Sequence, residues 1–310
     1  MNLLITGIHG FVGSNIVKAL APNHTIYGVD IIAPEKEGVK KTYSWEDVDN
    51  GNLPEVDAII HLAGKAHDTK NQAQADIYFK VNTGLTKKIY DYFLASSAKK
   101  FIQFSSVKAA ADQVQGEFVD ESVEPTPKGP YGESKIAAER YILSKMAKQT
   151  YILRPCMIHG PGNKGNLNLL YNVVKKGIPW PLGAFENRRT FMSIDNLCFI
   201  IGGLLQKDIE SGIYHVNDDE AVSTNELIEI ICEAMGKKPR IWHLNKTFMQ
   251  GIARIGDKLH LPLNSERLRK LTENYISSNT KIKAALGIPQ LPVTARQGLI
   301  KTIQSFENKV

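Results

Sequence analysis

Cysteine is scarce in this sequence, and long hydrophobic runs are missing from it. The 310 residues include three cysteines, Cys156, Cys198 and Cys232, which lie far apart and form no C-x-x-C pair. A disulfide framework is therefore not expected, and a reducing compartment is favoured. Nowhere do eighteen apolar residues follow one another, and the apolar start is too short and too rich in glycine for a signal peptide. We expect a soluble, cytoplasmic protein with no membrane partner.

The sequence also lacks the patterns of a metal site and of a nucleic-acid-binding surface. No group of histidines, cysteines or carboxylates has the spacing of metal ligands, so we predict no metal. The net charge is +6, and the lysine doublets are scattered rather than interleaved with aromatic residues. An anionic small substrate explains the positive excess as well as nucleic acid would, and we expect no nucleic-acid partner. The composition, 43% hydrophobic and 23% charged, is typical of a globular protein.

What the sequence does contain is a glycine-rich turn at its start. An apolar run at 3–5 predicts a buried strand, and Gly7, Gly10 and Gly13 follow it in a G-x-x-G-x-x-G pattern. A helical pattern begins at once with Phe11 and Val12. Glycines at these positions allow a tight turn, close approach of backbone N–H groups to a pyrophosphate, and close packing of helix on strand. The positive end of the helix favours the phosphates. These five residues are our first candidates for a dinucleotide site.

An acidic residue stands where such a site would hold the adenosine ribose. Asp30 follows a predicted strand at 25–29 and lies 17 residues after Gly13. A carboxylate there would accept hydrogen bonds from the ribose hydroxyls and disfavour a 2′-phosphate. The sequence therefore predicts NAD as the cofactor, with NADP the less favoured alternative.

Strand and helix patterns alternate from the start of the chain to about residue 107. Continuous apolar strands separated by helices predict a parallel sheet covered on both faces. We expect strands at 2–6, 25–30, 57–63, 100–105 and 150–154, a short strand near 41–45, helices at 76–95 and 131–147, and a loop over 108–130.

After Pro155 the pattern changes to a glycine-rich loop and short helices separated by prolines. It predicts a smaller, less regular lobe that closes over a ligand. The fold class is thus α/β, a doubly wound parallel sheet with a smaller mixed α/β C-terminal lobe. We place the dinucleotide-binding domain at 1–160, with contributions from about 190–217, and the substrate lobe at 161–310. Helices are expected at 167–176, 195–206, 223–235, 246–258, 279–286 and 294–306.

A second group of residues is a candidate for catalysis rather than for cofactor binding. Tyr131 and Lys135 are four residues apart in a predicted helix, so both side chains lie on one helix face. A phenol is a poor base at a pKa of about 10, and a neighbouring ammonium favours the phenolate. Such a tyrosine could exchange a proton with a sugar hydroxyl as hydride leaves the adjacent carbon. Ser105 and Ser106 end a predicted strand, where parallel sheets bind ligands, and a serine there could bond the reacting oxygen.

Together these motifs resemble the extended short-chain dehydrogenase/reductase superfamily, in its nucleotide-sugar branch. The resemblance implies a Rossmann domain that holds NAD(P) and a C-terminal lobe that holds a nucleotide sugar. It implies a catalytic triad of Ser106, Tyr131 and Lys135. The motifs occur in the family's order and cover essentially the whole chain. The implied cofactor site consists of Gly7, Gly10, Phe11, Val12, Gly13, Asp30, Leu62, Ala63, Asn82, Tyr131 and Lys135.

The later motifs imply a substrate site. The run 188–197 resembles the family's Arg-x-(aromatic)-x-x-Val-x-Asp-Leu segment, in which an arginine meets the diphosphate, and Arg189 is the best match. A guanidinium suits bidentate phosphate binding. Asn166 follows the Gly-Pro loop and would lie on a phosphate or on the uracil side. With Ser106, these residues form the implied substrate set. His61 is expected to bond backbone, and His67 could reach the sugar.

The two residues after Ser106 differ from those of some family members, and this difference reduces the number of possible reactions. The 4,6-dehydratases carry an Asp-Glu pair directly after the catalytic Ser or Thr, and the GDP-fucose synthases carry a Cys just after the serines. This chain has Val107 and Lys108 there. What remains is chemistry at C4, as in a bacterial subgroup of surface-polysaccharide enzymes. The leading hypothesis is a UDP-hexose or UDP-N-acetylhexosamine 4-epimerase, and a 4-keto-6-deoxy-sugar 4-reductase is the alternative.

Two further hypotheses concern partners and class. A cofactor-binding sensor without catalysis is a distant alternative, because such proteins usually lose the Tyr or the Lys. Members of the superfamily commonly dimerise through two helices of each subunit, here 76–95 and 131–147, so the resemblance implies a homodimer.

Overall fold

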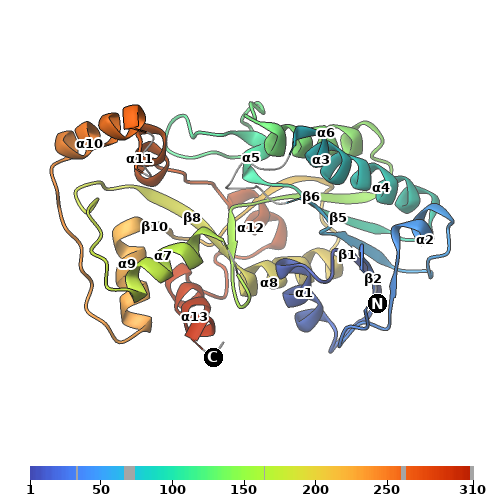
Figure 1. Ribbon diagram of the computed structural model, residues 1–310. Helices are drawn as coiled ribbons and strands as arrows, with labels where there is room; N and C mark the ends of the chain where they lie inside the picture. Colours follow the sequence, from blue (N-terminus) through green and yellow to red (C-terminus); the bar gives the residue numbers. More distant parts are fainter. Residues whose placement is uncertain (33, 66–73, 164, 260–262, 308–310) are drawn as a thin grey trace.

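The computed structural model of the chain describes residues 1–32, 34–65, 74–163, 165–259 and 263–307. It contains a large parallel sheet flanked by helices and, beside it, a smaller lobe (Figure 1). His67, which the sequence suggested as a possible sugar contact, lies outside the described residues.

The main sheet has seven strands, all parallel, in the order β3-β2-β1-β4-β5-β6-β9. This order reverses between β1 and β4, which opens a crevice at their carboxyl ends where doubly wound sheets bind ligands. The predicted fold class, a doubly wound sheet with a smaller mixed lobe, is confirmed. The strands are β1 (Asn2–Thr6), β2 (Thr25–Val29), β3 (Lys41–Tyr43), β4 (Ala58–His61), β5 (Lys100–Phe104), β6 (Gln149–Pro155) and β9 (Gly212–Val216).

Helices cover both faces of this sheet, each over its own apolar core (Figure 1). One core joins β-strand residues such as Ile5 and Leu153 to buried residues of α1, α8 and α12. The other joins Ile59 and Phe101 to residues of α2, α4 and α6. The helices are α1 (Phe11–Leu20), α8 (Ile194–Gln206) and α12 (Thr280–Leu286) on the first face, with α2 (Trp45–Asp49), α4 (Leu85–Ala95) and α6 (Pro130–Ser144) on the second.

The smaller lobe is built on a three-stranded sheet in the order β10-β8-β7, with one antiparallel and one parallel pair. Its own apolar core lies between α7, α9 and α13. At the outer end, α10 packs on α11. The elements are β7 (Met157–His159), β8 (Arg188–Ser193), β10 (Ala221–Ser223), α7 (Asn166–Lys175), α9 (Thr224–Ala234), α10 (Lys246–Leu259), α11 (Ser265–Thr272) and α13 (Ala295–Glu307).

Several elements were not predicted from the sequence, among them the short helix α2, and two of the differences are explained by helix caps. The stretch expected to be a loop over 108–130 begins inside a short helix, α5 (Val107–Ala110), because the Ser106 side chain caps it. The helix α11 was not predicted, since it carries few apolar residues and buries only Leu268. Its start is set by Asn264, whose side chain accepts a hydrogen bond from the N–H of Arg267.

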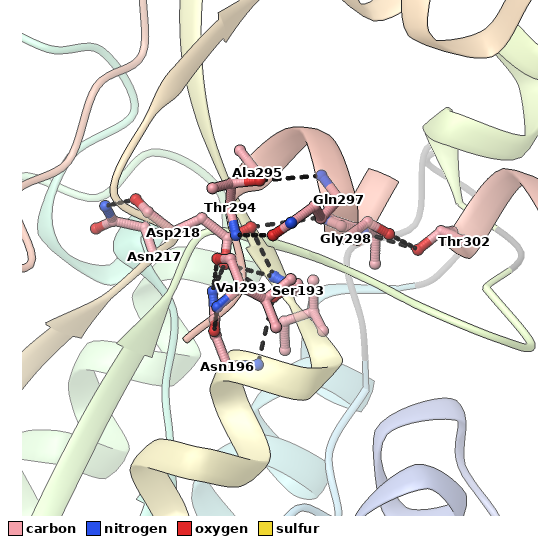
Figure 2. A network of polar contacts seen from close by, with 12 residues as sticks. Ser193, Asn196, Asn217, Asp218, Val293, Thr294, Ala295, Gln297, Gly298 and Thr302 are labelled. Atoms are coloured by element: carbon pink, nitrogen blue, oxygen red, sulfur yellow. Dashed lines mark hydrogen bonds and ion pairs between the residues drawn. The ribbon is translucent and has the colours of Figure 1, made fainter. Parts of the chain in front are cut away.

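A buried carboxylate ties the C-terminal elements to the rest of the fold. Figure 2 shows Asp218, Ser193 and Asn196 converging at the start of α8. Asp218 accepts hydrogen bonds from the backbone N–H of Ser193 (3.0 Å), its hydroxyl (2.9 Å) and the Asn196 amide (2.7 Å). Asn196 in turn exchanges two hydrogen bonds with the backbone of Val293, just before α13. The three donors are satisfied by one residue that is itself fully buried.

We predict that Asp218→Ala destabilises the protein by about 3 kcal/mol or more, because it leaves buried donors without an acceptor. The matched control is Asp57→Ala. Asp57 is exposed and also accepts a backbone hydrogen bond, from Asn2, so its loss should cost less than about 1 kcal/mol. Denaturant unfolding of both variants gives the two values. Equal losses would contradict the role assigned to Asp218.

Candidate active site

The glycine turn after β1 is shaped so that side chains cannot enter it. Gly7 has a φ of +72°, and a Cβ built on it would lie 2.9 Å from the backbone nitrogen of Ala63. A Cβ on Gly13 would lie 2.2 Å from the carbonyl oxygen of Gly7. The turn therefore packs against the loop after β4 on one side and against its own helix on the other. This is the close strand-to-helix packing expected from the sequence.

The same turn presents the start of α1 without a side-chain cap. Gly10 is the N-cap of α1 and is exposed, and as a glycine it offers no side chain to the first-turn N–H groups. Phe11, Val12 and Gly13 contribute these N–H groups, which have no acceptor within the helix. Backbone N–H groups and the helix dipole at such an end favour an anion. The residues present therefore fit the pyrophosphate of a dinucleotide.

Asp30 lies beside this turn, directly after β2. Its carboxylate accepts hydrogen bonds from the backbone N–H of His9 (3.0 Å) and of Ile31 (2.7 Å). The first bond links the ends of β2 and β1, whose strands are neighbours. The carboxylate is thus held beside the glycine turn.

The loop after β4 is fixed by a buried hydroxyl. The N–H groups of Leu62 and Ala63 both donate to the Thr6 hydroxyl, at 3.1 and 3.0 Å. His61 contacts the hydroxyls of Thr6 (2.7 Å) and Thr86 (3.1 Å) rather than backbone, so the expectation of a backbone bond was wrong. Burial lowers the pKa of His61 to about 3, and Lys135 adds to this effect. His61 is therefore a neutral structural residue at physiological pH.

Asn82 reaches the same loop from a π-helical segment. The helices α3 (Ala75–Tyr78) and α4 are joined by the π-helix η1 (Phe79–Gly84), which contains Asn82. Its side chain accepts from the N–H of Lys65 (2.8 Å) and donates to Ser134 (2.9 Å). The extra residue of a π-turn is a feature often found at functional sites. Asn82 thus links the loop after β4 to α6.

Ser106 and Tyr131 are brought together at the carboxyl end of β5. Ser106 lies two residues beyond this strand, and its hydroxyl is hydrogen-bonded to the Tyr131 side chain. The Tyr78 ring packs edge-on against Tyr131, with 6.2 Å between ring centroids. Burial raises the pKa of Tyr131, and the bond to Ser106 offsets only part of that effect. Burial thus favours the neutral phenol over the phenolate that a neighbouring ammonium was expected to favour.

Lys135 lies one helical turn further along α6. Its ammonium donates to the carbonyl oxygen of Phe104 at 2.9 Å and is nearly fully buried. Burial lowers its pKa to about 8, while the charge of Glu139 acts in the opposite direction. A Cβ on Gly64 would lie 3.2 Å from this nitrogen and 2.9 Å from the Asn82 amide oxygen. Gly64 therefore lets the loop after β4 approach Asn82 and Lys135 closely.

A buried ion pair that the sequence analysis missed supports these residues. Glu139, another turn along α6, binds Arg154 of β6 through two hydrogen bonds of 3.0 and 2.6 Å. Both side chains are at most 1% exposed. The Ser105 hydroxyl also donates to Glu139. The spacing of Tyr131, Lys135 and Glu139, each four residues apart, is a signal that would have placed Glu139 on the same helix face.

Two of the candidate substrate residues, Arg189 and Asn166, lie on the smaller lobe. Arg189, on β8, is half-buried and donates to the backbone carbonyls of Lys270 and Glu273 at the end of α11. Burial lowers its pKa, and Glu273 partly compensates. These bonds use two of its five N–H groups. Asn166 is exposed at the first residue of α7. The structure thus gives Arg189 a structural role that the sequence did not predict.

The two positions after Ser106 are occupied by a buried side chain and by a hydrogen-bonded lysine. Val107 is buried, and Lys108 donates to the backbone of Asp112 at 2.7 Å. The Lys108 ammonium also lies over the Tyr275 ring, 4.4 Å from its centroid.

Among the described residues, no group of three His, Cys, Asp or Glu could hold a metal ion. Within the same part of the chain, no helix is long and apolar enough to span a bilayer.

Comparison with known proteins defines the class. Residues 3–216 match the model of the NAD dependent epimerase/dehydratase family, and the chain belongs to this family. A UDP-glucose 4-epimerase of Vibrio cholerae is 30% identical over 256 residues, 76% of each chain. An N-acetyl-α-D-glucosaminyl-diphospho-ditrans,octacis-undecaprenol 4-epimerase of Escherichia coli O157:H7 is 25% identical over 98% of this chain and 94% of its own. Among solved structures, the UDP-glucuronic acid 4-epimerase from Bacillus cereus in complex with NAD aligns with a TM-score of 0.76. It is 20% identical, with 100% of this chain and 97% of that chain covered, and it shares the fold.

The family and the named activities of these relatives identify the chain as an enzyme of the extended short-chain dehydrogenase/reductase type, as the sequence predicted. Its reaction class is that of nucleotide-sugar epimerases, dehydratases and reductases.

The depressed pKa of Lys135 makes a prediction about stability. The folded protein releases this proton near pH 8, whereas the unfolded chain holds it to about pH 10.4. The unfolded state therefore binds more protons between these values, and stability rises with pH across that window. Relative to Lys135→Met, the wild-type protein should gain about 2–3 kcal/mol between pH 7.5 and pH 10.5. Urea unfolding of both proteins at several pH values tests this, and a constant difference would contradict it.

Proposed function

We propose that this protein is an NAD-dependent 4-epimerase of a UDP-hexose or UDP-N-acetylhexosamine. The observation that carries the proposal is the convergence of Ser106, Tyr131 and Lys135 at the carboxyl end of β5, beside the glycine turn. The two 4-epimerases among its relatives support C4 chemistry on a sugar bound through a diphosphate. NAD in the related Bacillus cereus structure supports the choice of cofactor.

Each residue of the triad takes one task. The Tyr131 hydroxyl exchanges a proton with the oxygen at C4 of the sugar. The Ser106 hydroxyl, already bonded to Tyr131, orients that oxygen. Lys135 places a positive charge near the phenol and could bond the cofactor's ribose. When bound, the nicotinamide of NAD would supply the hydride acceptor and donor for C4. In an epimerase the 4-keto sugar must turn over before the hydride returns.

The other site residues position the two ligands. The pyrophosphate would rest on the turn and helix start formed by Gly7, Gly10, Phe11, Val12 and Gly13, with Asp30 on the ribose. Leu62, Ala63 and Asn82 would line the nicotinamide side. On the smaller lobe, we assign the sugar diphosphate to Asn166 and Arg189, whose remaining N–H groups suit phosphate oxygens.

The 4-keto-6-deoxy-sugar 4-reductase remains the alternative, because the same triad serves it. The two residues after Ser106 disfavour a 4,6-dehydratase. Val107 has no ionisable group that could act as an acid or base, and the Lys108 ammonium is hydrogen-bonded to the backbone of Asp112 and paired with its carboxylate. A homodimer through the helices at 76–95 and 131–147, and a cytoplasmic location, belong to the same proposal.

Nucleotide released from the purified, denatured protein distinguishes the two reactions. We expect close to one NAD⁺ per chain, because an epimerase recycles its cofactor. A protein that is empty and takes reduced cofactor from solution would instead support the 4-reductase. Failure to bind either nucleotide would contradict the assignment of the glycine turn.

The role of Tyr131 predicts that Tyr131→Phe lowers turnover of UDP-N-acetylglucosamine or UDP-glucose by about 10²-fold or more, since no proton can be exchanged at C4. Cofactor affinity should be retained. The matched control is Tyr141→Phe, because Tyr141 lies on the same helix but is bonded to Asp91 at the surface. Full turnover by Tyr131→Phe would contradict the role assigned to Tyr131, whereas a wild-type protein that binds cofactor but turns over neither sugar nucleotide would favour the non-catalytic sensor.

The role of Asp30 predicts a change in cofactor preference. Asp30→Ser should raise the affinity for NADP relative to NAD by about tenfold or more, because it removes the charge that repels a 2′-phosphate. Titration with both nucleotides measures the ratio, with the surface variant Asp57→Ala as the control. An unchanged ratio would mean that Asp30 does not contact the ribose.

A further inference from the structure

The positive charge of this protein is concentrated in one segment. Residues 237–270 contain nine Lys and Arg against two Asp and Glu, a net charge of +7, whereas the whole chain carries +6. The remainder of the chain is therefore close to neutral. In the structure this segment contains α10 and most of α11, at the outer end of the smaller lobe (Figure 1). The basic residues are Lys237, Lys238, Arg240, Lys246, Arg254, Lys258, Arg267, Arg269 and Lys270.

The same segment exposes an apolar stripe on α10. Phe248, Ile255 and Leu259 follow one another at helical spacing, and their exposed fractions are 59%, 55% and 64%. A different face of α10, with Met249 and Ala253, is buried against the rest of the lobe. The three residues of the stripe are therefore not needed to pack α10 against the lobe. Large apolar side chains exposed together usually mark an interaction surface.

Charge and apolar residues combine on this surface in the manner of an interfacial helix. Lys258 lies in the last turn of α10, between Ile255 and Leu259 in sequence. A helix with an apolar stripe and basic flanks lies in the plane of a bilayer surface, where its apolar side chains enter the headgroup boundary and its cations meet anionic lipid. We propose that α10 docks this protein on an anionic membrane surface.

A second copy of the chain fits this surface less well. A two-fold interface would place each patch against itself and bring together the exposed Lys246, Arg254 and Lys258 of both copies. An anionic lipid surface instead complements the charge and accepts the apolar stripe at the same time. The proposal departs from the expectation of no membrane partner, which rested on the absence of a spanning segment.

The docking surface lies on the substrate side of the candidate active site. The carbonyls of Lys270 and Glu273, at the end of α11, are bound by Arg189. Tyr275, two residues further, donates to the backbone of Val107, next to Ser106. A contact at α10 would therefore hold the substrate lobe close to the membrane. The proposal is independent of which C4 reaction the site performs.

Sedimentation of the full chain with sucrose-loaded vesicles tests the proposal. We expect binding to vesicles that contain phosphatidylglycerol and little binding to pure phosphatidylcholine, with a loss of binding at high salt. Phe248→Ser should weaken binding by about tenfold or more, and Lys258→Glu by about fivefold or more. The control is Phe199→Ser, since Phe199 is also exposed (43%) but lies on α8.

Circular dichroism confirms that each variant is folded before it is compared. Three results would overturn the proposal: no vesicle binding, equal binding to both lipid compositions, or equal weakening by Phe199→Ser and Phe248→Ser. Sedimentation velocity could give a fourth result that overturns the proposal. If the wild-type protein is a dimer and Phe248→Ser dissociates it, the stripe is an interface with a second copy of the chain. None of these results affects the released-nucleotide and Tyr131→Phe experiments, so the proposed function is judged separately.

Discussion

The buried ion pair between Glu139 and Arg154 is the interaction on which the arrangement of the site depends. Two charges removed from water are stable only when their geometry and remaining hydrogen bonds are nearly complete. Here the carboxylate meets the guanidinium through two bonds and also accepts from Ser105. This fixes α6 against β6 and against the end of β5. Ser106 follows directly after Ser105, and Tyr131 and Lys135 precede Glu139 on the same helix, so one ion pair sets the relative position of all three candidate catalytic residues.

The second constraint is steric and acts at the glycine turn. Gly7 and Gly13 have no room for a Cβ, so the loop after β4, the turn and α1 approach one another at backbone distance. Thr6 completes this contact with bonds to the N–H groups of Leu62 and Ala63. Asn82 joins the loop after β4 to α6, because it bonds Lys65 on one side and Ser134 on the other. The residues proposed for cofactor binding and those proposed for catalysis are thus connected at one edge of the sheet.

Features encoded locally could be predicted, and features that depend on distant contacts could not. The glycine turn, Asp30 and the Tyr131–Lys135 spacing are local patterns, and the parallel sheet follows from its apolar strands. The partner of Lys135 is a carbonyl 31 residues away, and Glu139 meets Arg154 only because α6 lies on β6. The raised pKa of Tyr131 likewise reflects burial, which spacing does not reveal. The helix α11 was not predicted because it is mostly polar. The hydrogen bond from Arg189 to its end is a tertiary contact, which the sequence pattern does not indicate.

The central claim is that the sugar is oxidised at C4 and that the same hydride returns to it. Incubation with UDP-N-acetylglucosamine or UDP-glucose deuterated at C4 tests this directly, with mass spectrometry and NMR of the sugar product. We expect an epimerised product that keeps its deuterium at C4, with no exchange into water or added NADH. Loss of the label to solvent would show that a proton, not a hydride, leaves C4, and it would contradict the assigned roles of Tyr131 and the cofactor site.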